Sequence, residues 1–181
     1  LLQQCQIDAE VVTRRLPVVF GSGGRRPLEH VAMHTPDVVI AVGVAEGRTA
    51  VTPELVAINY RSARIPDNRG RKPMDAPVVA DGQTAYFSTL PVREIVDALG
   101  AEGIPAEISL SAGAFVCNDT FYQLQRALSG LDVASGFIHV PATAHMQRGD
   151  SVPVLPLEQI ARALEIAVNV TLAAKARTIA P

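Results

Sequence analysis

The chain has 181 residues, a formal net charge of -2 at pH 7 and 48% hydrophobic residues. This length can bury one sizeable core, so we expect a single domain over residues 1–181. The small net charge argues against a nucleic-acid partner, because phosphate backbones attract proteins with a large positive field. Basic residues do gather in residues 61–72, but beside glycine and proline they are typical of solvated loops.

Membrane and metal sites also find little support in the sequence. No apolar run is long enough for a membrane helix, and residues 1–5 lack the layout of a signal peptide, so we expect a cytoplasmic protein. In that reducing compartment Cys5 and Cys117 would both stay thiols. No C-x-x-C pair occurs, and His30 and His34 lack the glutamate of an H-E-x-x-H motif, so we expect no metal.

The first half of the chain predicts two strands around a short helix. Residues 11–20 are rich in β-branched side chains and predict a strand, and a glycine-rich flexible turn follows it. Residues 27–34 predict a helix with proline in its first turn, and residues 37–44 a strand buried on both faces. The next apolar stretch, 52–60, carries one carboxylate, and residues 65–70 form a turn-rich loop.

The second half predicts three further pairs of a strand and a helix. A strand at 84–90 precedes a helix at 92–99, whose apolar side chains recur at three-and-four spacing. A strand at 106–110 precedes a small-residue turn and a new helix. A strand at 136–140 precedes a long amphipathic helix at 157–174. This alternation predicts a largely parallel sheet covered on both faces, with ligand sites at the carboxyl ends of strands.

Cys117 is the first candidate for chemistry. It follows the small-residue turn and should lie near the amino end of the next helix. Helix-end amides and the helix dipole favour an anion there, which lowers the pKa of a thiol and makes it a better nucleophile. A cysteine between Val116 and Asn118 is more often a small buried residue, and the sequence alone leaves both interpretations open.

His139 and Glu54 are the other candidates. His139 lies near the carboxyl end of a strand, where it suits a general base, although a lone histidine there is often a hydrogen-bonded core residue. Glu54, if buried, needs a cationic or hydrogen-bonding partner such as an imidazole; otherwise it is an exposed residue on a helix turn after Pro53. With Cys117 these residue types fit a scheme of nucleophile, base and orienting group, but their spacing does not place them together.

The segment Ser-Ala-Gly-Ala-Phe-Val-Cys-Asn at residues 111–118 closely resembles the nucleophile motif of the pyroglutamyl-peptidase I family, also called pyrrolidone-carboxylate peptidases. Other stretches resemble the same family in the same order. They are residues 16–20, 47–48, 54–59, 63–68, 85–91 and 136–141. A likeness that runs in one order from residue 16 to the closing helix is specific to this family.

The resemblance implies a three-layer α/β/α sandwich with a mixed, mostly parallel sheet of the phosphorylase/hydrolase-like kind. It implies a cysteine peptidase that hydrolyses the amide bond after an amino-terminal pyroglutamyl residue and needs no cofactor. The expected partners are peptides that begin with pyroglutamate, and the family suggests a homo-oligomer.

The resemblance also implies roles for particular residues. On matching positions Cys117 is the nucleophile, His139 the general base and acid, and Glu54 the residue that holds the imidazole. Arg64 matches an arginine near the developing oxyanion, and Phe115 matches a wall of the pyroglutamyl pocket.

The chain departs from the family pattern in three places. Nothing matches the family's first strand and the following loop, so on the order of two dozen residues of the pattern lie outside the chain given. Val44 replaces a glutamine found in many members, and residues 142–147 differ from the usual ending after the catalytic histidine. An alternative is therefore a catalytically impaired or truncated relative that acts as a binding or assembly module. A nucleoside phosphorylase on a related fold lacks support, because no phosphate-cradling glycine motif occurs.

Overall fold

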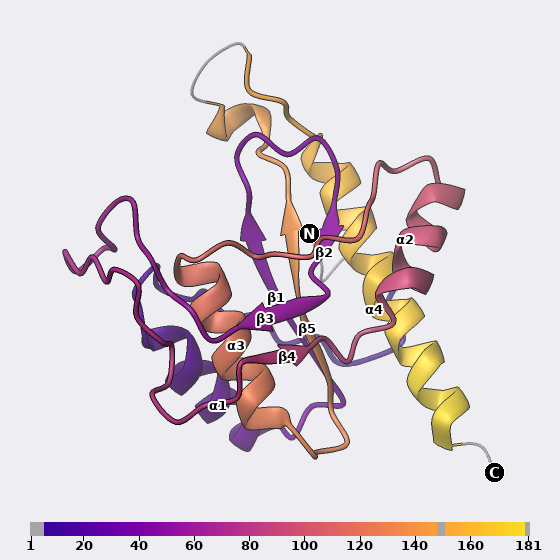
Figure 1. Ribbon diagram of the computed structural model, residues 1–181. Coiled ribbons are helices and arrows are strands. Elements are labelled where there is room, and N and C mark those ends of the chain that lie inside the picture. The colour runs from indigo at the N-terminus through magenta and orange to yellow at the C-terminus, as the bar shows by residue number, and fades with distance from the viewer. Residues whose placement is uncertain (1–5, 148–150, 180–181) are drawn as a thin grey trace.

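The computed structural model describes residues 6–147 and 151–179 (Figure 1). Its main sheet has the strand order β1-β5-β2, formed by Val38–Val44, Ala134–Val140 and Thr52–Pro53 respectively. Strand β5 runs parallel to β1 and antiparallel to β2, so the sheet is mixed. The central position of β5 buries six of its seven residues, His139 among them.

A second, two-stranded sheet follows β2 in the chain. Strand β3, Val56–Ile58, pairs antiparallel with β4, Ala85–Phe87. Both strands contact helix α3, Val116–Leu128, so this small sheet covers the helix that carries Cys117.

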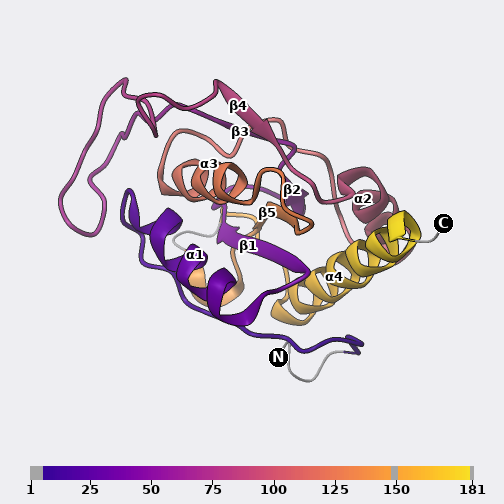
Figure 2. The ribbon, with the colours of Figure 1, turned by 90° about the horizontal axis from the view of Figure 1, so that it is seen from below.

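Helices cover both faces of the main sheet (Figure 2). Helix α3 packs on β5 and β1, and α1, Ser22–His34, packs on α3. On the other side α4, Leu157–Ile179, packs on the same two strands and carries α2, Val92–Ala101. The result is the expected three-layer α/β/α arrangement. A short 3-10 helix, Ala144–Met146, follows β5. None of the described helices combines the length and the apolar character needed to cross a membrane.

The segment predicted as a strand at residues 11–20 is not one. Among the described residues it has no strand partner, and Val18 stays exposed. β-branched residues favour extended backbone, but a strand forms only where a neighbouring ladder accepts its hydrogen bonds. Within residues 6–147 and 151–179, the segment makes one backbone bond of this kind to a distant part of the chain, from the Asn68 N–H to the Val18 carbonyl.

Other boundaries differ for similar local reasons. Helix α1 begins five residues before the predicted 27–34, because Gly21 adopts the left-handed conformation (φ 76°) that directs the chain into Ser22. The stretch 106–110 forms isolated parallel bridges rather than a regular strand. Strand β1 exists as predicted but is not buried on both faces, because it lies at the edge of the described sheet.

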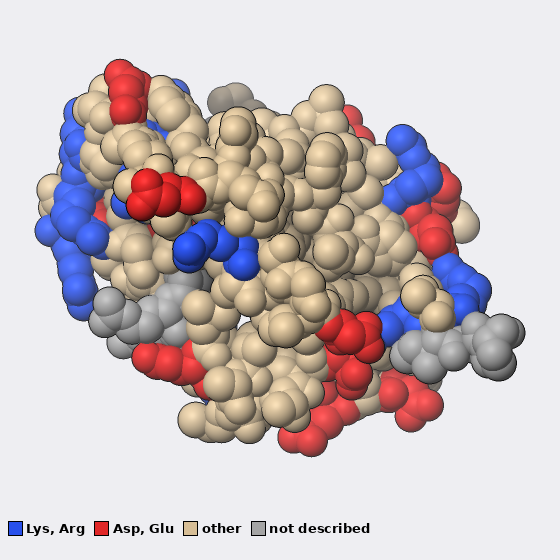
Figure 3. Space-filling model, turned by 60° about the horizontal axis from the view of Figure 1, so that its bottom comes forward, with Lys and Arg blue, Asp and Glu red and all other residues tan. Residues whose placement is uncertain are grey.

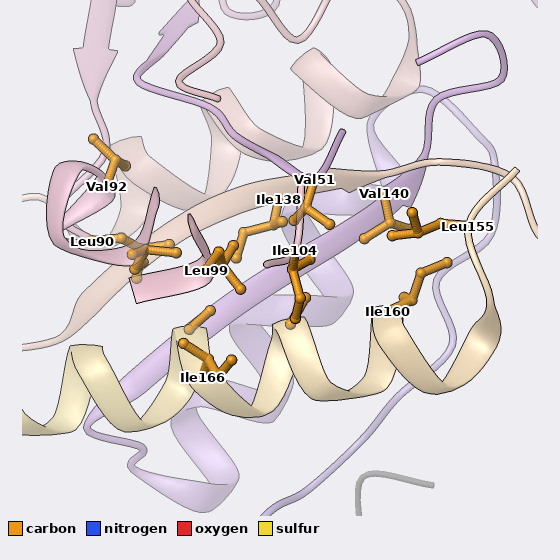
Figure 4. Packing of buried hydrophobic residues seen from close by; sticks show 13 residues of the cluster. Val51, Leu90, Val92, Leu99, Ile104, Ile138, Val140, Leu155, Ile160 and Ile166 are labelled. Atoms are coloured by element: carbon orange, nitrogen blue, oxygen red, sulfur yellow. The ribbon is translucent and has the colours of Figure 1, made fainter. Parts of the chain in front are cut away.

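The larger core lies between the sheet and the pair α2 and α4 (Figure 4). Ile138 and Val140 point from β5 toward this side, where Leu99 from α2 and Ile166 from α4 meet them. Leu99 and Ile138 are completely buried. The apolar spacing predicted for residues 92–99 thus corresponds to the buried face of α2.

Alternation along β5 sends its other side chains toward α3. Phe137 packs against Phe121 of α3 with ring centroids 6.0 Å apart, and Cys117 packs on the same cluster. His139 is two residues further along the strand and points to the same face. Its ring centroid lies 4.7 Å from that of Phe137. The period of the strand therefore places His139 on the side that carries Cys117.

Asn118 fixes the amino end of α3 to strand β3. Its Oδ1 accepts a hydrogen bond from the Ile58 N–H at 3.0 Å, and its Nδ2 donates to the carbonyls of Ile58 and Tyr60 at 2.9 Å each. The side chain is fully buried. Because Asn118 is the next residue after Cys117, these bonds also fix the backbone of the cysteine.

The basic residues of 61–72 divide into two groups. Arg64 and Arg69 are exposed on loops, as predicted. Arg61 is mostly buried and pairs with the buried carboxylate of Asp119 at 2.5 Å, so the solvated-loop prediction is wrong for it. On the face shown in Figure 3, Lys and Arg form a stripe along the left edge and lie among Asp and Glu at the right edge, while most of the surface is uncharged.

We expect Leu99→Ala to lower the free energy of unfolding by about 3 kcal/mol, because it empties part of the core between α2 and α4. Leu131 is 57% exposed and provides a matched control. Leu131→Ala should change stability by less than about 0.5 kcal/mol. Urea denaturation measures both values, and equal losses would contradict the core described above.

We expect Asn118→Asp to destabilise the fold by about 3 kcal/mol at neutral pH, because a carboxylate would face two carbonyl oxygens away from water. Its pKa would be raised in the folded state, so the loss should shrink as the pH falls below that raised value. Asn68→Asp, at an exposed loop position, is the matched control. A loss that does not depend on pH would contradict the hydrogen-bond pattern given for Asn118.

Candidate active site

Glu54 and His139 come together where β2 leaves β5. Thr52 is the antiparallel partner of His139, and the Glu54 N–H donates to the Phe137 carbonyl at 2.9 Å. This register places Glu54 Oε1 2.7 Å from His139 Nδ1. Glu54 is completely buried and His139 is 4% exposed. The alternative of an exposed glutamate on a helix turn is therefore wrong.

The contact fixes how the imidazole presents its nitrogens. An ionised carboxylate only accepts hydrogen bonds, so His139 Nδ1 carries the proton that points at Glu54. In the neutral ring Nε2 is then the basic nitrogen. No side chain within residues 6–147 and 151–179 hydrogen-bonds Nε2, so its lone pair stays available.

Opposing influences act on the Glu54 carboxyl. Burial works to raise its pKa, but the hydrogen bond from His139 and the positive charges of His139 and Arg48 outweigh burial and lower the pKa below its usual value. Glu54 is therefore ionised throughout the neutral range, as a group that orients an imidazole must be.

The position of Cys117 follows from strand β1. Gly43 is the parallel neighbour of His139, and a Cβ atom built on Gly43 would lie 3.3 Å from Cys117 Sγ. The same Cβ would lie 2.9 Å from the Phe137 ring, which shares its face of β5 with His139. The thiol thus rests on the bare backbone beside the imidazole. Cys117, His139 and Glu54 converge from three separate elements of the fold.

The Cys117 thiol is protonated in the free protein. Burial raises its pKa to about 11, with a smaller contribution from the negative charge of Glu54, while the charge of Arg48 acts in the opposite direction. The prediction that this pKa is lowered is therefore wrong, because burial raises it. A thiol in this state needs a base to become a nucleophile.

The first turn of α3 supplies hydrogen-bond donors next to that thiol. The helix begins at Val116, and Asp119 is the first residue whose N–H bonds back to Phe115, at 3.1 Å. The earlier N–H groups, including that of Cys117, have no acceptor within the helix. Such groups at a helix end can bind a developing negative charge.

The two remaining residues singled out in the sequence lie in different surroundings. Phe115 is half-buried and packs edge-to-face on Phe20, with ring centroids 5.2 Å apart. Arg64 is exposed, and its neighbour Ala63 is buried with Phe20 and Val116 in one apolar cluster. The loop that carries Arg64 therefore runs beside the start of α3.

Sequence reasoning did not assign Arg48 to the site. Its Nη1 lies 2.8 Å from Glu54 Oε1, the atom that also contacts His139, and it also donates to the Thr52 hydroxyl. Its Nη2 donates to the Ser111 carbonyl at 3.2 Å. A signal was present, because a buried carboxylate requires a cation nearby and Arg48 precedes Glu54 by only six residues.

Comparison with known proteins places the chain among peptidases. The family model described as pyroglutamyl peptidase matches residues 2–174. A pyrrolidone-carboxylate peptidase of Pseudomonas fluorescens is 44% identical over 161 residues, which cover 89% of this chain and 76% of the relative. Pyrrolidone-carboxylate peptidase 1 of Ralstonia nicotianae is 47% identical over 168 residues, or 91% of this chain and 78% of the relative.

Solved structures agree with the sequence comparison. Pyroglutamyl peptidase I of Bacillus amyloliquefaciens superposes with a TM-score of 0.89 at 40% identity, covering 93% of this chain and 82% of that one. Pyrrolidone carboxyl peptidase of Thermococcus litoralis gives a TM-score of 0.90 at 35% identity, covering 97% and 83%. By sequence and by fold, this chain belongs to the pyroglutamyl peptidase family.

Proposed function

We propose that Cys117, His139 and Glu54 carry out the reaction of this cysteine-type peptidase, which is hydrolysis of the amide bond after an amino-terminal pyroglutamyl residue. The observation that supports the assignment most strongly is the buried contact of 2.7 Å between Glu54 Oε1 and His139 Nδ1, on the face of β5 that carries the thiol. A fully buried carboxylate is costly, and here it is paired with the imidazole that needs orienting.

The first step transfers the Cys117 proton to His139 Nε2 as Sγ attacks the pyroglutamyl carbonyl carbon. An S–C bond forms, and the electron pair of the C=O bond moves to oxygen. The Cys117 N–H in the first turn of α3 donates to this oxyanion. The exposed Arg64 is the second proposed donor. Glu54 stabilises the imidazolium that appears on His139.

The second step breaks the C–N bond, and the departing amine takes the proton from His139 Nε2. A thioester on Cys117 remains. His139 then removes a proton from water, the hydroxide oxygen attacks the thioester carbon, and the S–C bond breaks. The sulfur regains the proton, and pyroglutamate leaves as a free acid. Every proton passes through Nε2, which agrees with Nδ1 being held by Glu54.

Selectivity for pyroglutamate follows from the chemistry of the lactam. The ring has no charged amino group, so an apolar pocket accepts it more readily than free glutamate, whose charges would lose their water. Phe115 is the proposed wall of this pocket. Its edge-to-face contact with Phe20 restricts its ring and supports that role.

Two broader expectations belong to the same proposal. A cytoplasmic location suits a peptidase that depends on a reduced thiol, because the cytosol keeps cysteines free. Self-association into a homo-oligomer is the second expectation, and sedimentation of the purified protein tests it. The alternative of an impaired binding module gains no support from the two relatives described above, which carry peptidase names.

We expect Cys117→Ala to abolish release of a fluorophore from a pyroglutamyl amide, by at least about 10³-fold, because the nucleophile is absent. Cys5→Ser is the matched control, since Cys5 lies outside the nucleophile motif, and it should keep the activity. Full activity of Cys117→Ala would rule out the assigned nucleophile. Circular dichroism shows whether both variants remain folded.

We expect Glu54→Gln to lower kcat by about 10² to 10⁴-fold, because a neutral amide no longer stabilises the imidazolium. The exposed Glu46 provides the control Glu46→Gln, which should leave kcat unchanged. Because its partners lower the pKa of Glu54, the wild-type enzyme should not lose kcat through protonation of Glu54 in the neutral range. A near-wild-type kcat for Glu54→Gln would remove Glu54 from the triad.

A further inference from the structure

Arg48 has no role in the reaction steps proposed above, yet it lies where several segments of the site meet. It follows Gly47, whose positive φ of 94° turns the chain between β1 and β2, and its guanidinium reaches back over the start of β2. There it contacts three residues: Thr52, Glu54 and the carbonyl of Ser111. The last of these lies in the loop that leads into α3 and Cys117.

The geometry at Glu54 shows what this contact constrains. Arg48 Nη1 and His139 Nδ1 lie 2.8 and 2.7 Å from the same oxygen, Oε1. Two donors on one oxygen fix the rotation of the carboxylate and therefore the plane in which the imidazole is held. The guanidinium is planar and offers donors in a fixed fork, so it can serve Oε1 on one side and the Ser111 carbonyl on the other.

The charge of Arg48 acts on the reacting pair as well. The charged or titratable groups that face one another here are Glu54 after β2, His139 on β5, Cys117 on α3 and Arg48 in the loop after β1. Glu54 favours the imidazolium and disfavours the thiolate. Arg48 opposes both effects, and its side chain is only 28% exposed, so solvent screens it incompletely.

We propose that Arg48 is a positioning residue that locks Glu54 against His139, ties this pair to the loop before Cys117, and through its charge sets the pH range in which the thiol and the imidazole react. The proposal rests on the function proposed above for the three groups. Nη1 and Nη2 of Arg48 already donate to Thr52, Glu54 and Ser111, so we assign its effect to the positioning of Glu54.

Alkylation of Cys117 by iodoacetamide tests the charge effect without any substrate. The rate at Cys117 is followed by peptide mass spectrometry between pH 7 and pH 10.5 in the full chain. Removing the cation in Arg48→Met should raise the thiol pKa by about one unit, so the rate on the rising limb should fall about tenfold. Arg48→Lys keeps the charge and should stay within about threefold of the wild type.

Steady-state kinetics on a pyroglutamyl amide test the positioning effect. Arg48→Met should lower kcat by about 10-fold or more with little change in KM, and should move the acid limb of kcat/KM upward by about one pH unit. Arg48→Lys should keep the wild-type limb but lose kcat, since an ammonium cannot serve all three acceptors. Arg14→Met is the control and should change neither quantity, because Arg14 is exposed and its side chain donates to the carbonyl of its neighbour Thr13.

Folded Arg48→Met with wild-type alkylation and a wild-type pH profile would overturn the proposal. If Arg48→Met does not fold, as judged by circular dichroism, Arg48→Lys decides: a wild-type kcat would refute the positioning role, and a shifted acid limb would refute the role of charge. Alkylation that responds as expected in a chain that cleaves no pyroglutamyl amide would refute the function and leave the role of Arg48 intact.

Discussion

The fold depends at its centre on one buried contact between a carboxylate and an imidazole. Glu54 has no exposed surface, so its charge is tolerable only because His139 and Arg48 meet it on the same oxygen. That requirement fixes the register of β2 on β5 and the turn that brings Arg48 back over the sheet. An apolar residue in place of Glu54 would avoid burying a charge but would leave the His139 imidazole with no preferred tautomer.

The state of the thiol gives this arrangement its chemical character. A cysteine whose pKa lies near 11 is almost entirely protonated at neutral pH, so the resting site holds no charged nucleophile. Charge separation then occurs mainly when a carbonyl carbon is present to receive the sulfur and helix-end donors are ready for the oxygen. Such a resting thiol should also react slowly with oxidants, because the thiolate is the form that oxidises.

Much of the fold could be predicted from local pattern, but the site only in part. Periodicity identified α2, α3 and α4 because their apolar faces are continuous, whereas it misassigned residues 11–20, where extended propensity finds no partner strand. For Cys117 the sequence left catalytic and structural interpretations open, and the family resemblance decided between them. Its pKa was mispredicted because burial of the thiol depends on side chains from several other segments, which the sequence around Cys117 does not show. Arg48 was missed because the contact between its side chain and Glu54 depends on the path of the turn after β1, which the sequence does not show.

The space at the site depends on the absence of a Cβ atom at Gly43. A methyl group at this strand position would press on the Phe137 ring and on the sulfur, so the space beside His139 exists only because the backbone is bare. Glycine inside a strand usually weakens it by about 0.5 to 1 kcal/mol, and engineers who seek heat-resistant proteins routinely replace it with alanine. In this molecule an alanine at position 43 would fill the space that Cys117 Sγ occupies beside strand β1. Thermostability design should therefore keep Gly43.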